Sequence, residues 1–106
     1  MNTETLRTFC LSLPDVTEAP RWESDLCFSF QGNMFCFTTE DVDSGASFKV
    51  MEEEFREMSH REGIIPAPYL AREYWVYVLE FSWLTDAEWE HYVQQSYLLV
   101  GGKVDR

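Results

Sequence analysis

The chain has 106 residues, of which 45% are apolar and 16% aromatic, and it carries a formal net charge of −11. This length suits a single domain, residues 1–106, and the apolar content excludes an intrinsically disordered chain. No apolar run approaches the roughly 20 residues of a membrane-spanning helix, and the first residues contain no export signal, so we expect a cytoplasmic protein without a membrane anchor.

The first segment predicts a helix followed by a loop. Asn2 or Thr3 offers a capping side chain, and apolar residues recur at helical spacing as far as Leu13. Pro14 ends the helix. Residues 14–22 show no regular pattern, so we expect an irregular connection to the first strand.

A β-hairpin is expected next. Residues 26–30 and 34–39 alternate apolar with small or polar side chains on either side of a tight turn that is centred on Gly32 and Asn33. In that register, four phenylalanines share the core face: Phe28, Phe30, Phe35 and Phe37.

A third strand and a second helix follow. Residues 46–50 predict a short strand with Phe48 on one face and Lys49 on the other. Apolar residues at helical spacing mark a helix over 51–58, and Gly63 ends it.

The segment 66–72 contains two prolines and leads directly into an aromatic strand at 74–81. Proline removes a donor and disfavours helix in the residue before it, so we expect an ordered turn that delivers Tyr69 and Arg72 to the start of the strand. A last helix begins at a capping box formed by Thr85 and Glu88. The expected order is α-β-β-β-α-β-α, an α+β fold in which helices pack on one face of an antiparallel sheet.

The three cysteines indicate a reducing compartment. Cys10, Cys27 and Cys36 form no Cys-x-x-Cys pair and lie in apolar segments, where a thiol behaves as a small apolar side chain. We therefore expect three reduced thiols, in keeping with the cytoplasm.

No set of residues predicts catalysis. His60 and His91 fall on different expected helices, and the chain has no nucleophile elbow, phosphate loop or dinucleotide motif, so we expect neither an enzyme nor a cofactor. Glu53 and Glu57 lie one helical turn apart and could share a hard cation with an acid of the preceding turn. Acids at a helix N-terminus also complement the helix dipole, and this interpretation is favoured, so we expect no metal site.

Two features predict a binding surface. The strand at 74–81 carries large side chains on both faces, so one face of the sheet is either an aromatic platform or is covered by Trp22 and its loop. Among the eight basic residues, Arg21, Lys49 and Arg72 are the set that can converge beside the sheet and make a small anion-binding site.

Five motifs occur in order along the chain. They are Leu11-Ser-Leu-Pro-Asp-Val-Thr-Glu18, Phe28-x-x-x-Gly32-x-Met-Phe35, Phe48-Lys49, Pro66-Ala-Pro-Tyr-Leu-Ala-Arg72 with Trp75-Val76, and Ser96-Tyr97-x-Leu-Val100. In these motifs the chain resembles the MmcQ/YjbR family of small bacterial proteins. The resemblance implies a frataxin-like or double-wing fold and DNA binding, the latter by analogy of fold.

Carried over to this sequence, the resemblance implies a site made of Lys49, Pro68, Tyr69, Arg72 and Trp75. The two aromatic residues would stack on a base or close the site, and the two basic residues would meet phosphate. Many members have a lysine in the hairpin turn where this chain has Asn33.

Two partner classes therefore stay open. One is DNA, bound weakly and in a salt-sensitive way because the chain is so acidic. The other is a small anion, or a basic protein that meets the acidic surface.

Overall fold

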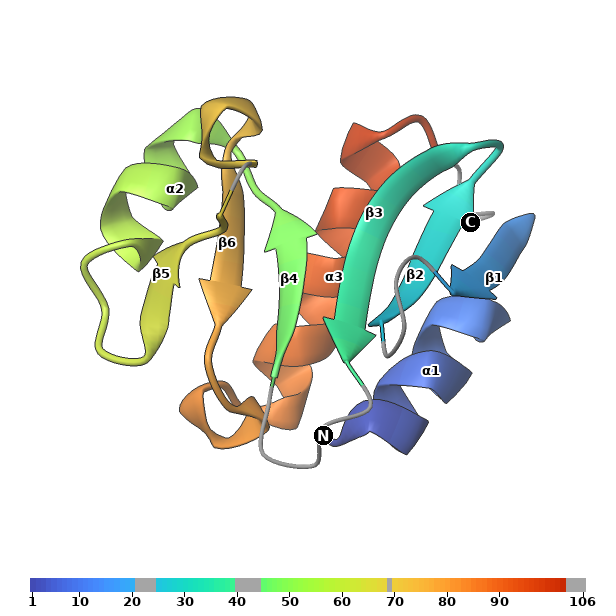
Figure 1. The fold of residues 1–106 in the computed structure, drawn as a ribbon, viewed down its shortest axis with the longest axis horizontal. Helices are drawn as coiled ribbons and strands as arrows, with labels where there is room; N and C mark the ends of the chain where they lie inside the picture. Colours follow the sequence, from blue (N-terminus) through green and yellow to red (C-terminus); the bar gives the residue numbers. More distant parts are fainter. Residues whose placement is uncertain (21–24, 40–44, 69, 103–106) are drawn as a thin grey trace.

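The computed structural model describes residues 1–20, 25–39, 45–68 and 70–102 and has an α+β fold (Figure 1). The helices of the described part are α1 (Thr3–Ser12), α2 (Glu52–Met58) and α3 (Asp86–Leu99). The strands are β1 (Val16–Pro20), β2 (Asp25–Phe30), β3 (Asn33–Thr39), β4 (Ala46–Lys49), β5 (Ile64–Pro66) and β6 (Trp75–Val78). Two 3-10 turns flank β6, namely η1 (Ala71–Glu73) and η2 (Phe81–Trp83).

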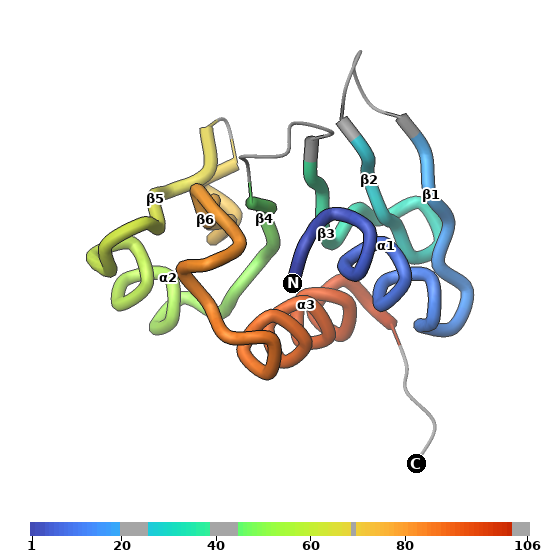
Figure 2. Tube along the Cα trace, turned by 90° about the horizontal axis from the view of Figure 1, so that it is seen from below, coloured from blue at the N-terminus to red at the C-terminus, as the bar shows by residue number. Residues whose placement is uncertain are grey.

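The strands form one antiparallel sheet in the order β1-β2-β3-β4-β6-β5. Figure 2 shows α1 and α3 on the same side of this sheet, and α2 contacts β5 and β6. Side chains alternate along each strand, so the sheet has a helical face, which includes Phe48 and Val76, and an open face, which includes Ser47 and Tyr77. The predicted fold class, an antiparallel sheet with helices on one face, is confirmed.

The core lies between the helical face and α3. Trp89, Val93 and Tyr97 of α3 are fully buried, as are Phe28, Phe35 and Phe48 of the sheet. The indole nitrogen of Trp89 donates to the carbonyl of Phe81 at 2.8 Å, so the large ring enters the core without losing a hydrogen bond.

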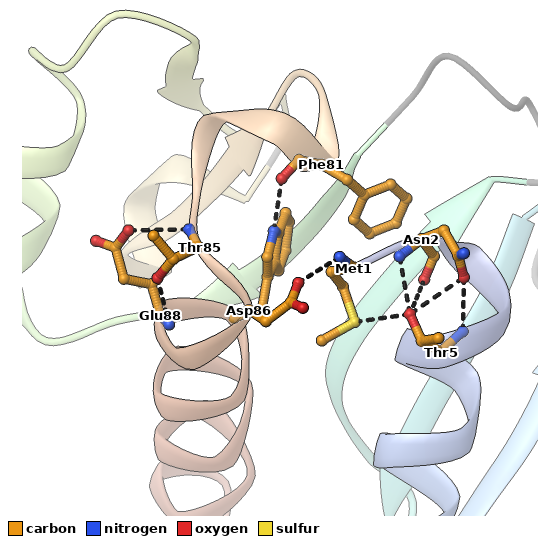
Figure 3. A network of polar contacts seen from close by, with 8 residues as sticks. Met1, Asn2, Thr5, Phe81, Thr85, Asp86 and Glu88 are labelled. Atoms are coloured by element: carbon orange, nitrogen blue, oxygen red, sulfur yellow. Dashed lines mark hydrogen bonds and ion pairs between the residues drawn. The ribbon is translucent and has the colours of Figure 1, made fainter.

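Reciprocal capping boxes begin α1 and α3 (Figure 3). The Asn2 side chain accepts from the Thr5 amide at 2.8 Å, and the Thr5 hydroxyl accepts from the Asn2 amide at 2.8 Å. Thr85 and Glu88 make the equivalent pair of bonds at 3.1 and 3.0 Å. Each box satisfies amide groups that a helix leaves without partners at its start, and both predicted helix starts are confirmed.

The hairpin turn lies one residue earlier than the sequence predicted. Gln31 and Gly32 are its central residues, with φ of 48° and 86°, and Phe30 pairs with Asn33. Positive φ at both central residues is typical of a type I′ turn, whose twist matches that of the flanking strands. The predicted centre at Gly32-Asn33 is therefore wrong, because Asn33 already belongs to β3.

One of the four phenylalanines that were predicted to share the core face does not lie on it. A register shift between Phe28 and Ser29 gives β3 one extra residue, so that Phe28 pairs with Cys36 and Cys27 pairs with Phe37. Phe28, Phe30 and Phe35 are buried in the core, whereas Phe37 lies on the open face. A bulge of this kind moves every residue beyond it to the other face of the sheet.

Two strands appear where the sequence predicted none. β1 occupies the expected loop. Its Val16 packs against the core and its Glu18 forms an ion pair with Arg7 of α1, so its inward residues are not uniformly apolar and show no alternating pattern. β5 has three residues between Gly63 and the proline turn, which is too short for a recognisable pattern.

The three cysteines are buried thiols, and no helix among the described residues is long and apolar enough to cross a membrane. A hydrogen bond with Cys10, together with burial, raises the pKa of the Cys36 thiol well above its ordinary value. A thiol in such an environment stays protonated and unreactive.

Candidate functional site

An open groove of about 520 Å³ lies at the end of the sheet where the hairpin tip, the η1 turn and the last turn of α3 meet, toward the top of Figure 1. Its lining residues come from four parts of the chain: Gly32, Asn33, Met34, Lys49, Leu70, Glu73, Trp75, Leu99 and Val100. The groove combines an apolar wall, two residues of opposite charge, an amide side chain and a turn of backbone.

The position of Lys49 is fixed at both its backbone and its side chain. Its amide donates to the Ser96 hydroxyl at 2.9 Å, and that hydroxyl donates to the carbonyl of Phe35, which ties β4, β3 and α3 together. The Lys49 ammonium donates to the backbone carbonyl of Glu73 and lies 5.9 Å from the ring centre of Tyr74. Lys49 therefore presents its charge beside the η1 turn.

The η1 turn is held by its own backbone. Leu70 donates to Ala67 at 3.2 Å, Ala67 donates to Trp75 at 3.0 Å, and Trp75 donates to Leu70 at 3.3 Å. Tyr74 adopts left-handed backbone geometry with φ of 64°, which turns the chain from η1 into β6. The segment is thus an ordered turn that leads into the strand, as the two prolines predicted.

Arg72 lies on this turn between Leu70 and Glu73, two of the lining residues, and its side chain is exposed. Tyr69 and Arg21, which were predicted to join the site, lie outside the described residues, as does Trp22, which was considered as a cover for the open face. The structure therefore brings Lys49 and Trp75 into one groove, whereas Arg72 is an exposed chain neighbour of Glu73 and is not among the residues that line the groove.

The other described arginines have carboxylate partners. Arg7 pairs with Glu18, Arg56 with Glu52 at 3.2 Å, and Arg61 with Glu88 at 3.4 Å. In the described part of the chain, neither Lys49 nor Arg72 forms an ion pair. Among the basic side chains of the described residues, Lys49 and Arg72 are therefore the two that are not paired with a carboxylate.

Trp75 lines the groove but is almost entirely buried. Only 3% of the residue is exposed, and its ring stacks on Phe37 at a centroid distance of 5.8 Å. The stacking role that the resemblance implied for Trp75 therefore has little ring surface available to it.

Sequence reasoning missed the hairpin tip and the end of α3 as walls of the groove. Leu99 is 39% exposed and provides part of the apolar wall. Its exposure depends on where α3 ends relative to the hairpin, and no local pattern encodes that relation.

A second hollow, of about 540 Å³, lies where the chain start meets η2 and α3 (Figure 3). The amino group of Met1 forms an ion pair there with Asp86, and Glu80 and Thr85 also line the hollow. Across the described residues, no group of three potential ligands could hold a metal ion.

Comparison with known proteins assigns the chain to a family. The family model described as YjbR matches residues 11–99, so the chain belongs to the YjbR family, as its motifs predicted. No curated protein matches the chain.

Solved structures with the same fold include the following two. Protein DR2400 of Deinococcus radiodurans, described as having a DUF419 domain, has 26% identity and a TM-score of 0.81 over 93% of this chain and 78% of its own. A protein from Pseudomonas syringae has 19% identity and a TM-score of 0.75 over 94% of this chain and 99% of its own. Neither description names a ligand or a frataxin-like or double-wing fold, so those expectations stay predictions.

Proposed function

We propose that the chain is a non-enzymatic binding protein that holds nucleic acid weakly, through a backbone phosphate placed at the groove between Lys49 and Arg72. The observation that carries the proposal is the pairing pattern of the cations: these two have no carboxylate partner in the described part of the chain, Lys49 lines the groove, and Arg72 directly precedes the lining residue Glu73. The ligand class comes from the family resemblance.

The rest of the site supports a short contact with a single strand. The groove has apolar walls at Leu70, Leu99 and Val100, against which one unstacked base can pack. The surroundings are acidic, and two cations neutralise few phosphates, so a long duplex would gain little and would be repelled by the net charge of −11.

Titration of labelled single-stranded and duplex DNA at low and moderate salt tests the proposal. We expect weak binding at low salt, preferential for the single strand, and its loss in a variant that combines Lys49→Ala with Arg72→Ala. Arg56→Ala is the matched control, because Arg56 is exposed and paired with Glu52 on α2. Binding that survives the double substitution, or no binding by the wild type at low salt, would contradict the proposal.

A gain of function provides an independent check. Asn33 lines the groove. Many members of the MmcQ/YjbR family have a lysine in that turn. We expect Asn33→Lys to tighten single-strand binding several-fold, because it adds a third cation to the same groove. Gln31→Lys adds the same charge on the other side of the turn, where it does not line the groove, and should have the smaller effect.

A basic protein partner is the second candidate, and the charge distribution favours it. The exposed surface of α2 and the turn after it carries Glu52, Glu53, Glu57 and Glu62. Replacing Glu53 and Glu57 by glutamine should weaken capture of a cationic partner and leave DNA binding intact or slightly stronger. The opposite pattern would reject this candidate.

A further inference from the structure

The groove contains two opposite charges that do not neutralise each other. Lys49 donates to the backbone carbonyl of Glu73 and not to its carboxylate. Glu73 is exposed, is one of the residues that line the same groove, and its carboxylate has no ion-pair partner among the described residues. A ligand that presents only an anion would meet Lys49 favourably and Glu73 unfavourably.

The ligand that satisfies both charges carries an anionic group and an N–H donor on one apolar body. Leu70, Leu99 and Val100 provide the apolar wall for that body. At about 520 Å³ the groove is larger than a free amino acid requires and lies within the size range of sites that hold whole small ligands. A nucleotide of cytosine, adenine or guanine has the required parts, because its phosphate is the anion and the exocyclic amine of its base is the donor.

We propose that Glu73 is a specificity-determining residue that selects cytosine over thymine in the bound nucleotide. Cytosine presents an amino group at the position where thymine presents a carbonyl oxygen, and a carboxylate accepts a hydrogen bond from the first and repels the second. The phosphate of the same strand lies at Lys49. This selection rests on the proposed nucleic-acid binding and adds to it a preference that the Lys49 and Arg72 contacts cannot provide, because phosphates are the same in every sequence.

The test compares two labelled single strands of equal length, one of cytosine and one of thymine, by fluorescence anisotropy at low salt and mildly alkaline pH. We expect the wild type to bind the cytosine strand about two- to tenfold more tightly, the range of one hydrogen bond. In Glu73→Gln the ratio should fall close to one, because an amide can accept from cytosine and donate to thymine.

Two variants separate the possible failures. Glu62→Gln removes one negative charge from an exposed residue outside the groove, so it should leave the ratio unchanged. Lys49→Ala should weaken both strands alike. Equal binding of the two strands by the wild type, or a ratio that Glu73→Gln leaves unchanged, would overturn the role of Glu73. Either result would leave the proposed nucleic-acid binding standing. A wild type that binds neither strand would overturn the proposed function and this inference with it.

Discussion

Phe35 and Phe37 lie two positions apart on β3 and yet occupy opposite faces of the sheet. Phe35 is fully buried and meets Tyr97 at 5.4 Å between ring centres, whereas Phe37 is partly exposed and stacks on Trp75. We expect Phe35→Ala to lower the free energy of unfolding by about 3–5 kcal/mol and Phe37→Ala to lower it by clearly less. Urea unfolding of both variants measures the difference, and equal losses would contradict the assignment of faces.

Glu88 makes the start of α3 sensitive to pH. The hydrogen bond from the Thr85 amide, followed by the charge of Arg61, lowers the pKa of Glu88 against the opposing effect of desolvation. A carboxyl group whose pKa is lower in the folded state stabilises the protein above its unfolded pKa, and that stabilisation is lost as the pH falls.

We therefore expect the melting temperature of the wild type to exceed that of Glu88→Gln at neutral pH, and the gap to shrink as the pH falls below about 4.3, the ordinary glutamate value. Thermal unfolding, monitored by circular dichroism at neutral pH and at a pH below about 4.3, measures the gap. Thr85→Ala removes the other half of the capping box and should cost about 1 kcal/mol at neutral pH. A gap that widens in acid would contradict the sign.

Residue-level features with a local cause could be predicted from the sequence. The capping boxes depend on side chains three residues apart, and the opposite faces of Phe48 and Lys49 depend on neighbours in one strand. The face of Phe37 could not be predicted, because it depends on an extra residue in the pairing of two strands. Such a bulge leaves no mark in the hydrophobic alternation of either strand alone.

At the scale of elements, the hairpin turn carries a residue that is poorly suited to its backbone. Gln31 has φ of 48° in a turn where asparagine at this position is strongly preferred, and Gly32 has φ of 86° with open space around it. We expect Gln31→Asn to raise the free energy of unfolding by about 0.5–1 kcal/mol, and Gly32→Ala to lower it by about 1 kcal/mol through backbone strain alone. Chemical denaturation checks both, and a neutral Gly32→Ala would argue against the type I′ turn.

The edge strands explain why the sequence predicted fewer strands than the sheet contains. β5 has only three residues, and both edge strands end in a proline, Pro20 in β1 and Pro66 in β5. Short edge strands that contain proline limit pairing with other chains, but the same properties remove the alternating pattern by which strands are recognised. The four interior strands and three helices were predictable in order because each has a pattern of its own.

The groove was predictable in part for a related reason. Lys49 and Trp75, which the sequence predicted for the site, meet through the pairing of β4 with β6. Glu73, which it did not predict, joins them because the η1 turn leads directly into β6. Asn33 comes from the hairpin before Lys49 and Leu99 from the end of α3, and the two reach one groove only because α3 packs across β3 and β4. A site assembled by tertiary packing has no spacing in the sequence that marks it.

At the scale of the whole molecule, net charge and size act together. The described part of the chain spans 32 × 29 × 26 Å, and the chain carries a formal net charge of −11. At about 0.01 M salt the Debye length is about 30 Å, so the net negative charge of the whole chain repels a polyanion that approaches the groove. At about 0.15 M salt it is about 8 Å, and only the nearest charges act there.

Salt should therefore have two opposing effects on oligonucleotide binding. For a single strand, release of counterions lowers the logarithm of the binding constant by about 0.7 per phosphate contact for each tenfold increase in salt. Two contacts, at Lys49 and Arg72, therefore give a slope of about −1.4. Screening of the net negative charge acts in the other direction. We expect the measured slope to be shallower than −1.4, with the wild type binding weakly throughout.

Anisotropy titrations over a salt series measure this slope, and a thermal melt over the same series provides the matched control. Screening also reduces repulsion among the acids of the folded chain, so the melting temperature should rise with salt while oligonucleotide binding falls or stays level. A slope much steeper than −2 would mean that more cations take part than Lys49 and Arg72, and would contradict a site confined to this groove.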